Sequence, residues 1–190
     1  FVMANSASDA RKSELELRKK IIKTGCVDVM ISLSRNFFYV RTLPVMLWFF
    51  DKNKPKDKKN KILFIDASKI YNEIDRTHRN FKPEQIEFLA NIVRLYRGEK
   101  TKNDYGSHEL MIKEFPNGYN NVKNLCKEGD LKEVEYNDWS LTPGRYIDLD
   151  IKKDDGINFN ERLSFLNEEL ISLNEDAEKL KTKISENISE

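Results

Sequence analysis

The sequence predicts an α/β protein with a mixed β-sheet, followed by a mostly helical region and a long C-terminal helix. Three observations predict this class. Residues 1–33 have the pattern of a strand, a helix and a second strand, and two strongly apolar runs follow at residues 44–50 and 62–65. Residues 159–184 then repeat apolar side chains with heptad spacing. We therefore expect a sheet early in the chain and a coiled-coil helix at its end.

The composition is that of a folded protein with a highly charged surface. Of the 190 residues, 39% are hydrophobic, 11% are aromatic and 34% are charged. The 33 Lys and Arg residues nearly balance the 32 Asp and Glu residues, so any contact with nucleic acid has to be local. Cys26 and Cys126 show no pairing pattern and no apolar run has membrane length, which predicts a cytoplasmic protein with free thiols and no membrane contact.

The first elements in order are a strand at residues 1–5, a helix and a strand at residues 27–33. The chain opens on an apolar run without an initiator methionine, which indicates a piece of a longer protein. Ser13 and Glu16 have the spacing of a capping box, and Gly25 ends the helix. Strand, helix and strand form a βαβ unit, which favours parallel pairing and a right-handed crossover.

The apolar runs at residues 44–50 and 62–65 predict two further strands. The connection between them carries six lysines from residue 52 to residue 61, which we expect to lie in water. Because this connection has no helical periodicity, it favours an antiparallel hairpin and hence a mixed sheet. The near-continuous hydrophobicity of both runs predicts strands covered on both faces, as in three-layer α/β proteins.

Residues 69–150 are expected to be mostly helical. Residues 69–77 are a short candidate helix, and residues 83–98 are a long one with proline in its first turn and glycine at its end. The expected divisions of the chain are residues 1–68, with the sheet, then 69–150, and then the tail helix at 151–190.

The tail has the clearest periodicity in the chain. Its apolar residues alternate four and three positions apart and form what we call the heptad seam: Phe159, Leu163, Leu166, Leu170, Leu173, Ala177, Leu180 and Ile184. Burying a leucine contributes roughly 1.5 to 3 kcal/mol, so the seam represents on the order of 10 kcal/mol that a lone helix cannot gain. We expect the seam to pack on another subunit, with an intramolecular helix or a second copy of the chain as alternatives.

Few motifs of self-contained chemistry are present. The sequence has no glycine-rich phosphate loop, no zinc-ligand spacing and only two histidines, so it predicts no metal site. Asp66 either caps a following helix together with Ser68 or serves as a catalytic carboxylate. The charged pairs at residues 75–76 and 78–79 are either a solvated helix end or a phosphate-contacting cluster.

Three stretches, ANSASDARKSELELRKKIIKTGCVDVMISLSRNFFYVRTLPVMLWFFDKNK, KILFIDAS and WSLTPGRYI, carry a family resemblance. They resemble the C-terminal part of the modification subunit of type I restriction–modification systems, which is an adenine-specific DNA methyltransferase that uses S-adenosylmethionine. The most specific part is the succession RKKII, VDVMISL, NFFY, LP and WFFDK followed by FIDAS. The resemblance runs from Phe1 to about Ile147, and the tail is similar to the family's C-terminal helix.

The resemblance implies that residues 1–68 supply the last strands and helix of a methyltransferase sheet. The family's cofactor loop and Asn-Pro-Pro-aromatic tetrad would lie upstream of Phe1, because no such tetrad occurs in this chain. It therefore implies no catalytic residue here, no tight binding of S-adenosylmethionine and no methylation by this chain alone. The intact enzyme would transfer a methyl group to the exocyclic amine of a flipped adenine.

Three adjacent rings, Phe37, Phe38 and Tyr39, precede the strand at residues 44–50. Flipping a base out of the duplex costs a few kcal/mol, and aromatic stacking returns about 1 to 3 kcal/mol per base. The resemblance implies that Phe38 stacks on the target base, with Asn36, Phe37 and Tyr39 beside the pocket and Arg41 as a candidate contact to the DNA backbone. We expect Phe37 to pack inward; the alternative is that all three rings belong to the core.

The implied partners are double-stranded DNA, the specificity subunit bound through the heptad seam, and the restriction subunit in the full complex. An alternative function of a different class is a stand-alone, non-catalytic protein-interaction module with an α/β body and a coiled-coil hook. In that case the chain would act without an upstream catalytic part.

Overall fold

In the computed structural model the chain divides into two units. The first is a compact unit of residues 1–149, and the second comprises residues 150–190. The described residues are 1–38 and 42–147, together with 163–164, 167–171, 173–174, 177–178 and 180–181 of the tail. No helix among these residues is long and apolar enough to cross a membrane.

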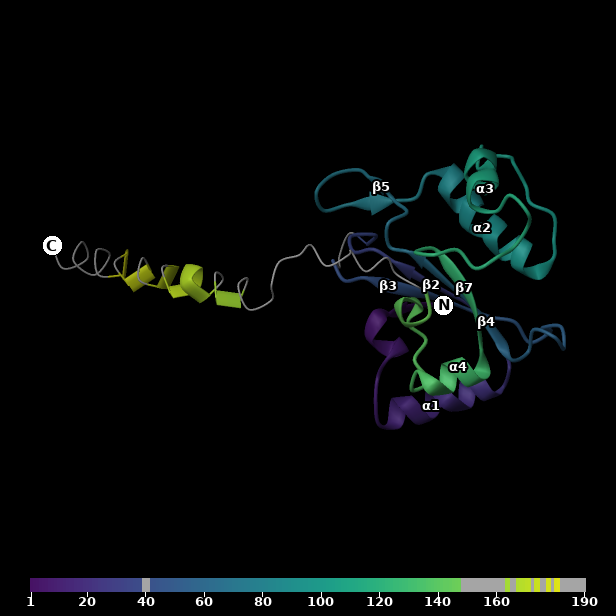
Figure 1. Ribbon diagram of the computed structural model, residues 1–190, viewed down its shortest axis with the longest axis horizontal. Coiled ribbons are helices and arrows are strands. Elements are labelled where there is room, and N and C mark those ends of the chain that lie inside the picture. Colours follow the sequence, from purple (N-terminus) through teal and green to yellow (C-terminus); the bar gives the residue numbers. More distant parts are fainter. Residues whose placement is uncertain are drawn as a thin grey trace. The chain divides into compact units, whose positions relative to one another are not determined.

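A five-stranded mixed sheet forms the centre of the first unit (Figure 1). Its spatial order is β1-β3-β2-β4-β7. The strands are β1 Val2–Ala4, β2 Val27–Leu33, β3 Val45–Phe50, β4 Lys61–Ala67 and β7 Cys126–Asp130. β2 and β4 are parallel, and every other pair of neighbours is antiparallel. The mixed α/β class predicted from the sequence is confirmed.

Helix α1, Ser13–Lys23, joins β1 to β2 as predicted. β1 and β2 each pair antiparallel with β3, so they run parallel to each other with β3 between them. The predicted capping box is wrong, because Ser13 is already helical and the N-cap position falls on Lys12, which makes no side-chain capping bond. The Glu16 carboxylate pairs with Lys19 at 3.0 Å instead.

The predicted hairpin between β3 and β4 is also wrong, because β2 lies between them. Met30 of β2 stands opposite Trp48 of β3 on one side and Phe64 of β4 on the other. β2 is almost entirely buried, so both of its edges need hydrogen-bond partners from neighbouring strands. The chain after β3 therefore crosses the end of β2, where the N–H of Asp51 donates to the carbonyl oxygen of Cys26 at 2.8 Å.

Helices cover both faces of the sheet, which confirms the three-layer prediction (Figure 1). On one face, α1 and α4, Leu131–Tyr136, pack with Met30 and Phe64. On the other face, α2, Pro83–Arg97, and α3, His108–Glu114, pack on the remaining core side chains of β2 and β4. Two 3₁₀ turns, η1 Asn5–Ser8 and η2 Pro143–Arg145, complete the unit.

Full coverage of both strand runs, however, holds for β4 and not for β3. A groove of about 520 Å³ lies between α2 and the sheet, lined mainly by apolar side chains that include Leu47, Phe49 and Ile86. Phe49 is 45% exposed and Ile86 is 55% exposed. The outer end of β3 is open on this face because α2 packs over β2 and β4.

The helix predicted at residues 69–77 is a β-hairpin instead. Its strands are β5, Asn72–Glu73, and β6, Arg79–Asn80. The Asp75 carboxylate closes the turn between them by accepting hydrogen bonds from the main-chain N–H and the hydroxyl of Thr77, both at 2.7 Å. Asp and Thr side chains that bond the nearby backbone stabilise turns at the expense of helix, which explains the difference.

The expected division after residue 68 does not separate two compact units. Residues 1–149 form one unit, and β7 extends the main sheet by pairing with β4 from Lys61 opposite Asp130 to Ile65 opposite Cys126. Lys, Glu, Gly and Asp within β7 are poor strand formers, so pairing with β4 and not local preference makes this strand.

The described residues of the tail are helical. Five members of the heptad seam are among them, and all five are exposed: Leu163, Leu170, Leu173, Ala177 and Leu180. Phe159, Leu166 and Ile184 lie outside the described residues. Pairing of this helix into a coiled coil stays a prediction.

Candidate functional site

The candidate site lies where the parallel strands β2 and β4 end at the same edge of the sheet. Ligands of open α/β sheets characteristically bind beyond the carboxyl ends of the strands. The Ser32 hydroxyl near the end of β2 donates to the Asp66 carboxylate of β4 at 2.9 Å. This bond joins the two strand ends, and the loop that carries the aromatic triplet starts two residues after Ser32.

Asn36 holds this loop against the β5–β6 hairpin. Its carbonyl oxygen accepts from the N–H of Arg79 at 2.8 Å, and its Nδ2 donates to the carbonyl oxygen of Arg76 at 3.3 Å. The residue is 8% exposed and has a φ of +72°, a left-handed conformation that asparagine tolerates better than most side chains. Its Oδ1 is buried and accepts no hydrogen bond from the described part of the chain.

The two described rings of the triplet lie in different surroundings. Phe37 is half-buried against the core on the α2 face, and its ring centroid is 4.6 Å from that of Phe81. Phe38 is 43% exposed. Tyr39 and Arg41 lie outside the described residues. The loop thus anchors one ring in the protein and presents the next ring to the outside.

Asp66 has a local role in the described structure. Its Oδ1 accepts from the Ser32 hydroxyl and from the N–H of Ser68, both at 2.9 Å. The predicted helix cap is wrong, because no helix follows Asp66 directly. The carboxylate instead closes the turn after β4. These bonds fix the strand ends beneath the Asn36 loop.

Two charged side chains of the β5–β6 hairpin, Asp75 and Arg79, make contacts with neighbouring side chains. Hydrogen bonds from Thr77 and then His78 hold the pKa of the Asp75 carboxyl well below its usual range. The Arg79 guanidinium stacks on the Tyr71 ring at 3.8 Å and lies 3.7 Å from Glu73. The predicted solvated helix end at residues 75–79 is therefore the tip and second strand of a hairpin, in which the side chains of Asp75 and Arg79 contact neighbouring side chains.

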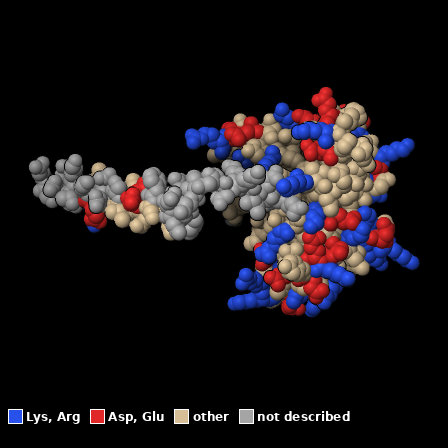
Figure 2. Space-filling model, in the orientation of Figure 1, with Lys and Arg blue, Asp and Glu red and all other residues tan. Residues whose placement is uncertain are grey.

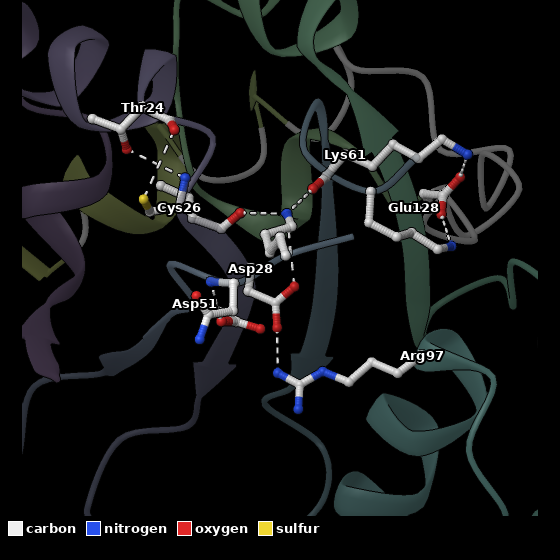
Figure 3. Close-up of polar contacts among 11 residues, drawn as sticks. Thr24, Cys26, Asp28, Asp51, Lys61, Arg97 and Glu128 are labelled. Carbon is white, nitrogen blue, oxygen red and sulfur yellow. Dashed lines mark hydrogen bonds and ion pairs between the residues drawn. The ribbon is translucent and has the colours of Figure 1, made fainter. Parts of the chain in front are cut away.

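A second polar cluster lies at the opposite end of β2 (Figure 3). Asp28 pairs with Arg97 of α2 and lies 3.7 Å from the ammonium group of Lys54. Lys54 also donates to the carbonyl oxygens of Val27, at 2.8 Å, and of Lys61. Burial lowers the pKa of Lys54 although Asp28 opposes the shift.

The expectation that all six lysines of this connection lie in water is wrong for Lys54, which is 5% exposed. Its bonds to strand carbonyls tie the connection between β3 and β4 to the sheet. Asp28 lies near the start of β2 and the Phe38 loop follows its end at Leu33, five strand residues or about 17 Å further on, so the cluster is remote from Phe38 and has a structural role. Sequence reasoning missed Lys54 because its neighbours in the run are also lysines.

Comparison with known proteins decides the family. A sequence model described as N-6 DNA Methylase matches residues 1–155. The chain belongs to this family. Among curated relatives, the type I restriction enzyme MjaIX methylase subunit of Methanocaldococcus jannaschii is 35% identical to this chain over 186 residues, which are 98% of the chain and 30% of the relative. The HindI methylase subunit of Haemophilus influenzae is 31% identical over 167 residues, 87% of the chain and 33% of the relative.

The chain therefore spans about a third of the length of these relatives. The crystal structure of the type I restriction-modification system methyltransferase subunit from Streptococcus thermophilus superimposes with a TM-score of 0.57 at 21% identity, covering 77% of this chain and 26% of that one. At this identity the likeness shows the fold. The family predicted from the three sequence stretches is confirmed by the sequence model and the curated relatives.

Proposed function

We propose that this chain is part of the DNA methyltransferase subunit of a type I restriction–modification enzyme. The intact enzyme would transfer a methyl group from S-adenosylmethionine to the exocyclic amine of an adenine flipped out of the duplex, in the cytoplasm. Family membership and the methylase-subunit relatives support this reaction class. The stand-alone interaction module receives less support, because the relatives are about three times longer than the chain.

The observation that carries the proposal is the exposed ring of Phe38 at the carboxyl edge of β2. Phe37 packs inward and Asn36 is bonded to the hairpin, so the two residues before Phe38 are held in place before a base arrives. A base that stacks on a pre-ordered ring avoids the entropy cost of fixing the loop. Stacking of about 1 to 3 kcal/mol then offsets much of the cost of extruding the adenine.

The described residues of this chain offer no glycine-containing loop for the methyl donor at this edge of the sheet. The described glycines lie outside the carboxyl ends of β2 and β4: Gly25 precedes β2, Gly129 lies inside β7, and the others border helices and turns. The sequence also has no Asn-Pro-Pro-aromatic tetrad. We therefore assign the S-adenosylmethionine site and the catalytic residues to the remainder of the intact protein and expect no methylation by this chain alone.

The tail is proposed to bind the specificity subunit, with the restriction subunit joining the full complex on DNA. The five described members of the heptad seam support this role, because all of them are exposed along a helix. An exposed row of leucines gains burial only when another helix covers it.

Replacing Phe38 in the intact methyltransferase complex tests the proposed role in base flipping. We expect Phe38→Ala to slow methylation. It should also weaken binding of a duplex in which the target adenine faces an abasic site, and is therefore extruded easily, by about 5- to 150-fold. Phe49→Ala is the matched control, because Phe49 is 45% exposed and Phe38 43%, and Phe49 lies at the other end of the sheet. Equal affinity and equal methylation rate in both variants would remove Phe38 from this role.

A further inference from the structure

Two arginines next to Phe38 have no role in the function proposed above. Arg35 lies in the loop directly before Asn36, and Arg76 lies at the tip of the β5–β6 hairpin. Both are exposed, and neither side chain has an ion-pair or hydrogen-bond partner in the described part of the chain. The exposed arginines Arg97 and Arg145, in contrast, pair with Asp28 and Asp9.

The backbone brings these two arginines together. The Nδ2 of Asn36 donates to the carbonyl oxygen of Arg76 at 3.3 Å, so the residue after Arg35 touches Arg76 itself. The neighbouring bond from the Arg79 N–H to the Asn36 carbonyl oxygen makes the connection a double one. Arg35, Phe38 and Arg76 therefore belong to two segments that are hydrogen-bonded to each other, and all three residues are exposed.

The acidic groups of the hairpin do not neutralise these guanidinium groups directly. Asp75 is engaged by Thr77 and His78, and Glu73 lies beside Arg79, which also stacks on Tyr71. Figure 2 shows basic and acidic side chains side by side where Figure 1 places the β5 hairpin. The chain as a whole has a net charge of only +1, so this pair is a local feature.

We propose that Arg35 and Arg76 form a phosphate clamp that holds the DNA backbone next to the extruded adenine. The inference rests on the proposed function, because it places the clamp beside the ring that stacks on the base. The guanidinium group binds phosphate through two parallel hydrogen bonds, and contacts of this kind fix the register of a protein on DNA without reading sequence. Holding the backbone while the base leaves the stack is a task for such contacts.

The test measures DNA affinity of the intact complex as a function of salt, with Arg35→Gln, Arg76→Gln and the double variant. The DNA is the duplex that the complex methylates, prepared with its normal target pair and with an extruded adenine. We expect each single substitution to weaken binding of both duplexes about tenfold and to reduce the slope of log affinity against log salt by about one. The double variant should lose about two units of slope.

Arg11→Gln is the matched control, because Arg11 is also exposed but precedes α1, which packs on the other face of the sheet. It should change neither affinity nor slope. An unchanged slope in both Arg35→Gln and Arg76→Gln overturns the clamp. The clamp is also overturned if these variants bind DNA normally and instead lose another subunit from the complex. Phe38→Ala should lower only the preference for the extruded target. If the arginine variants keep the parent salt slope while Phe38→Ala still lowers the preference for the extruded target, the clamp alone is refuted. If the arginine variants lower the slope while Phe38→Ala leaves the preference unchanged, the role of Phe38 alone is refuted.

Discussion

The carbonyl oxygen of Asn36 accepts a hydrogen bond from the N–H of Arg79 at 2.8 Å and so joins the Phe38 loop to the β5–β6 hairpin. The two residues are far apart in the sequence, and both segments are short. The loop gains order from the hairpin, and the hairpin gains a second attachment to the sheet. This hydrogen bond holds the backbone next to the exposed Phe38 ring in place.

Substitution of Asn36 should separate the effect of its backbone conformation from that of its side chain. In Asn36→Gly the left-handed backbone is retained and only the Nδ2 bond to Arg76 is lost. In Asn36→Ala the same bond is lost and the left-handed conformation adds about 1 kcal/mol of strain. We expect Ala to destabilise the chain more than Gly in urea unfolding. Equal stability of the two variants would show that the backbone leaves this conformation without cost.

Lys54 should be the lysine of its connection that matters for stability. Lys54→Met leaves the carbonyl oxygens of Val27 and Lys61 without their donor and Asp28 without one cation, so we expect a loss of about 2 to 4 kcal/mol. Lys56→Met, at an exposed position of the same run, should change stability by less than about 0.5 kcal/mol. Denaturant titration of both variants measures the difference. Similar unfolding midpoints of the two variants would contradict the stabilising role of Lys54.

Glu87 should make the chain sensitive to acid. Burial raises the pKa of this carboxyl, but hydrogen bonds from Ser107 and from the N–H groups of Asp104 and Tyr105 outweigh burial and lower the pKa to about 2. A carboxyl with a depressed folded-state pKa contributes stability that is present above its unfolded value and is lost as the pH falls toward the folded value. We therefore expect stability to decline between about pH 4.5 and pH 2.

The matched variant Glu87→Gln removes this titration and keeps the shape of the side chain. Its stability should be lower near neutral pH and should fall less steeply below pH 4.5. Thermal unfolding across this range, with Glu84→Gln at a half-buried position of the same helix turn as the control, measures the effect. Parallel curves for the parent and Glu87→Gln would show that another group governs the acid limb.

Deletion of residues 157–190 should abolish association with the specificity subunit and leave the first unit folded. The reason is that residues 1–149 form a compact unit by themselves, and the described seam leucines are exposed. Co-purification from cells that express both subunits measures association, and circular dichroism of the shortened chain checks folding. Replacing Leu170 and Leu173 by Ser is a milder version, with Ser172→Ala as its control. Retained co-purification would assign the seam another purpose.

The sequence by itself determined the α/β class, the long helix α2, the family and the ring triplet that drew attention to the Phe38 loop. Each of these rests on local periodicity or on an ordered set of short motifs, which a single chain displays without knowledge of its neighbours. The end of α2 at Gly98 is of this kind, because its φ of +76° is a local requirement that glycine meets at no cost.

Only the tertiary structure decided the neighbours of each strand. β2 lies between β3 and β4 because a strand that is buried on both faces must pair along both edges. The local sequence of β2 does not show which segments of the chain pair with those edges. β7 became a strand through its pairing with β4, and Lys54 became a buried donor because the carbonyls of Val27 and Lys61 meet at one place. The contact between Asn36 and Arg79 arose in the same way, from the packing of segments that are distant in the chain.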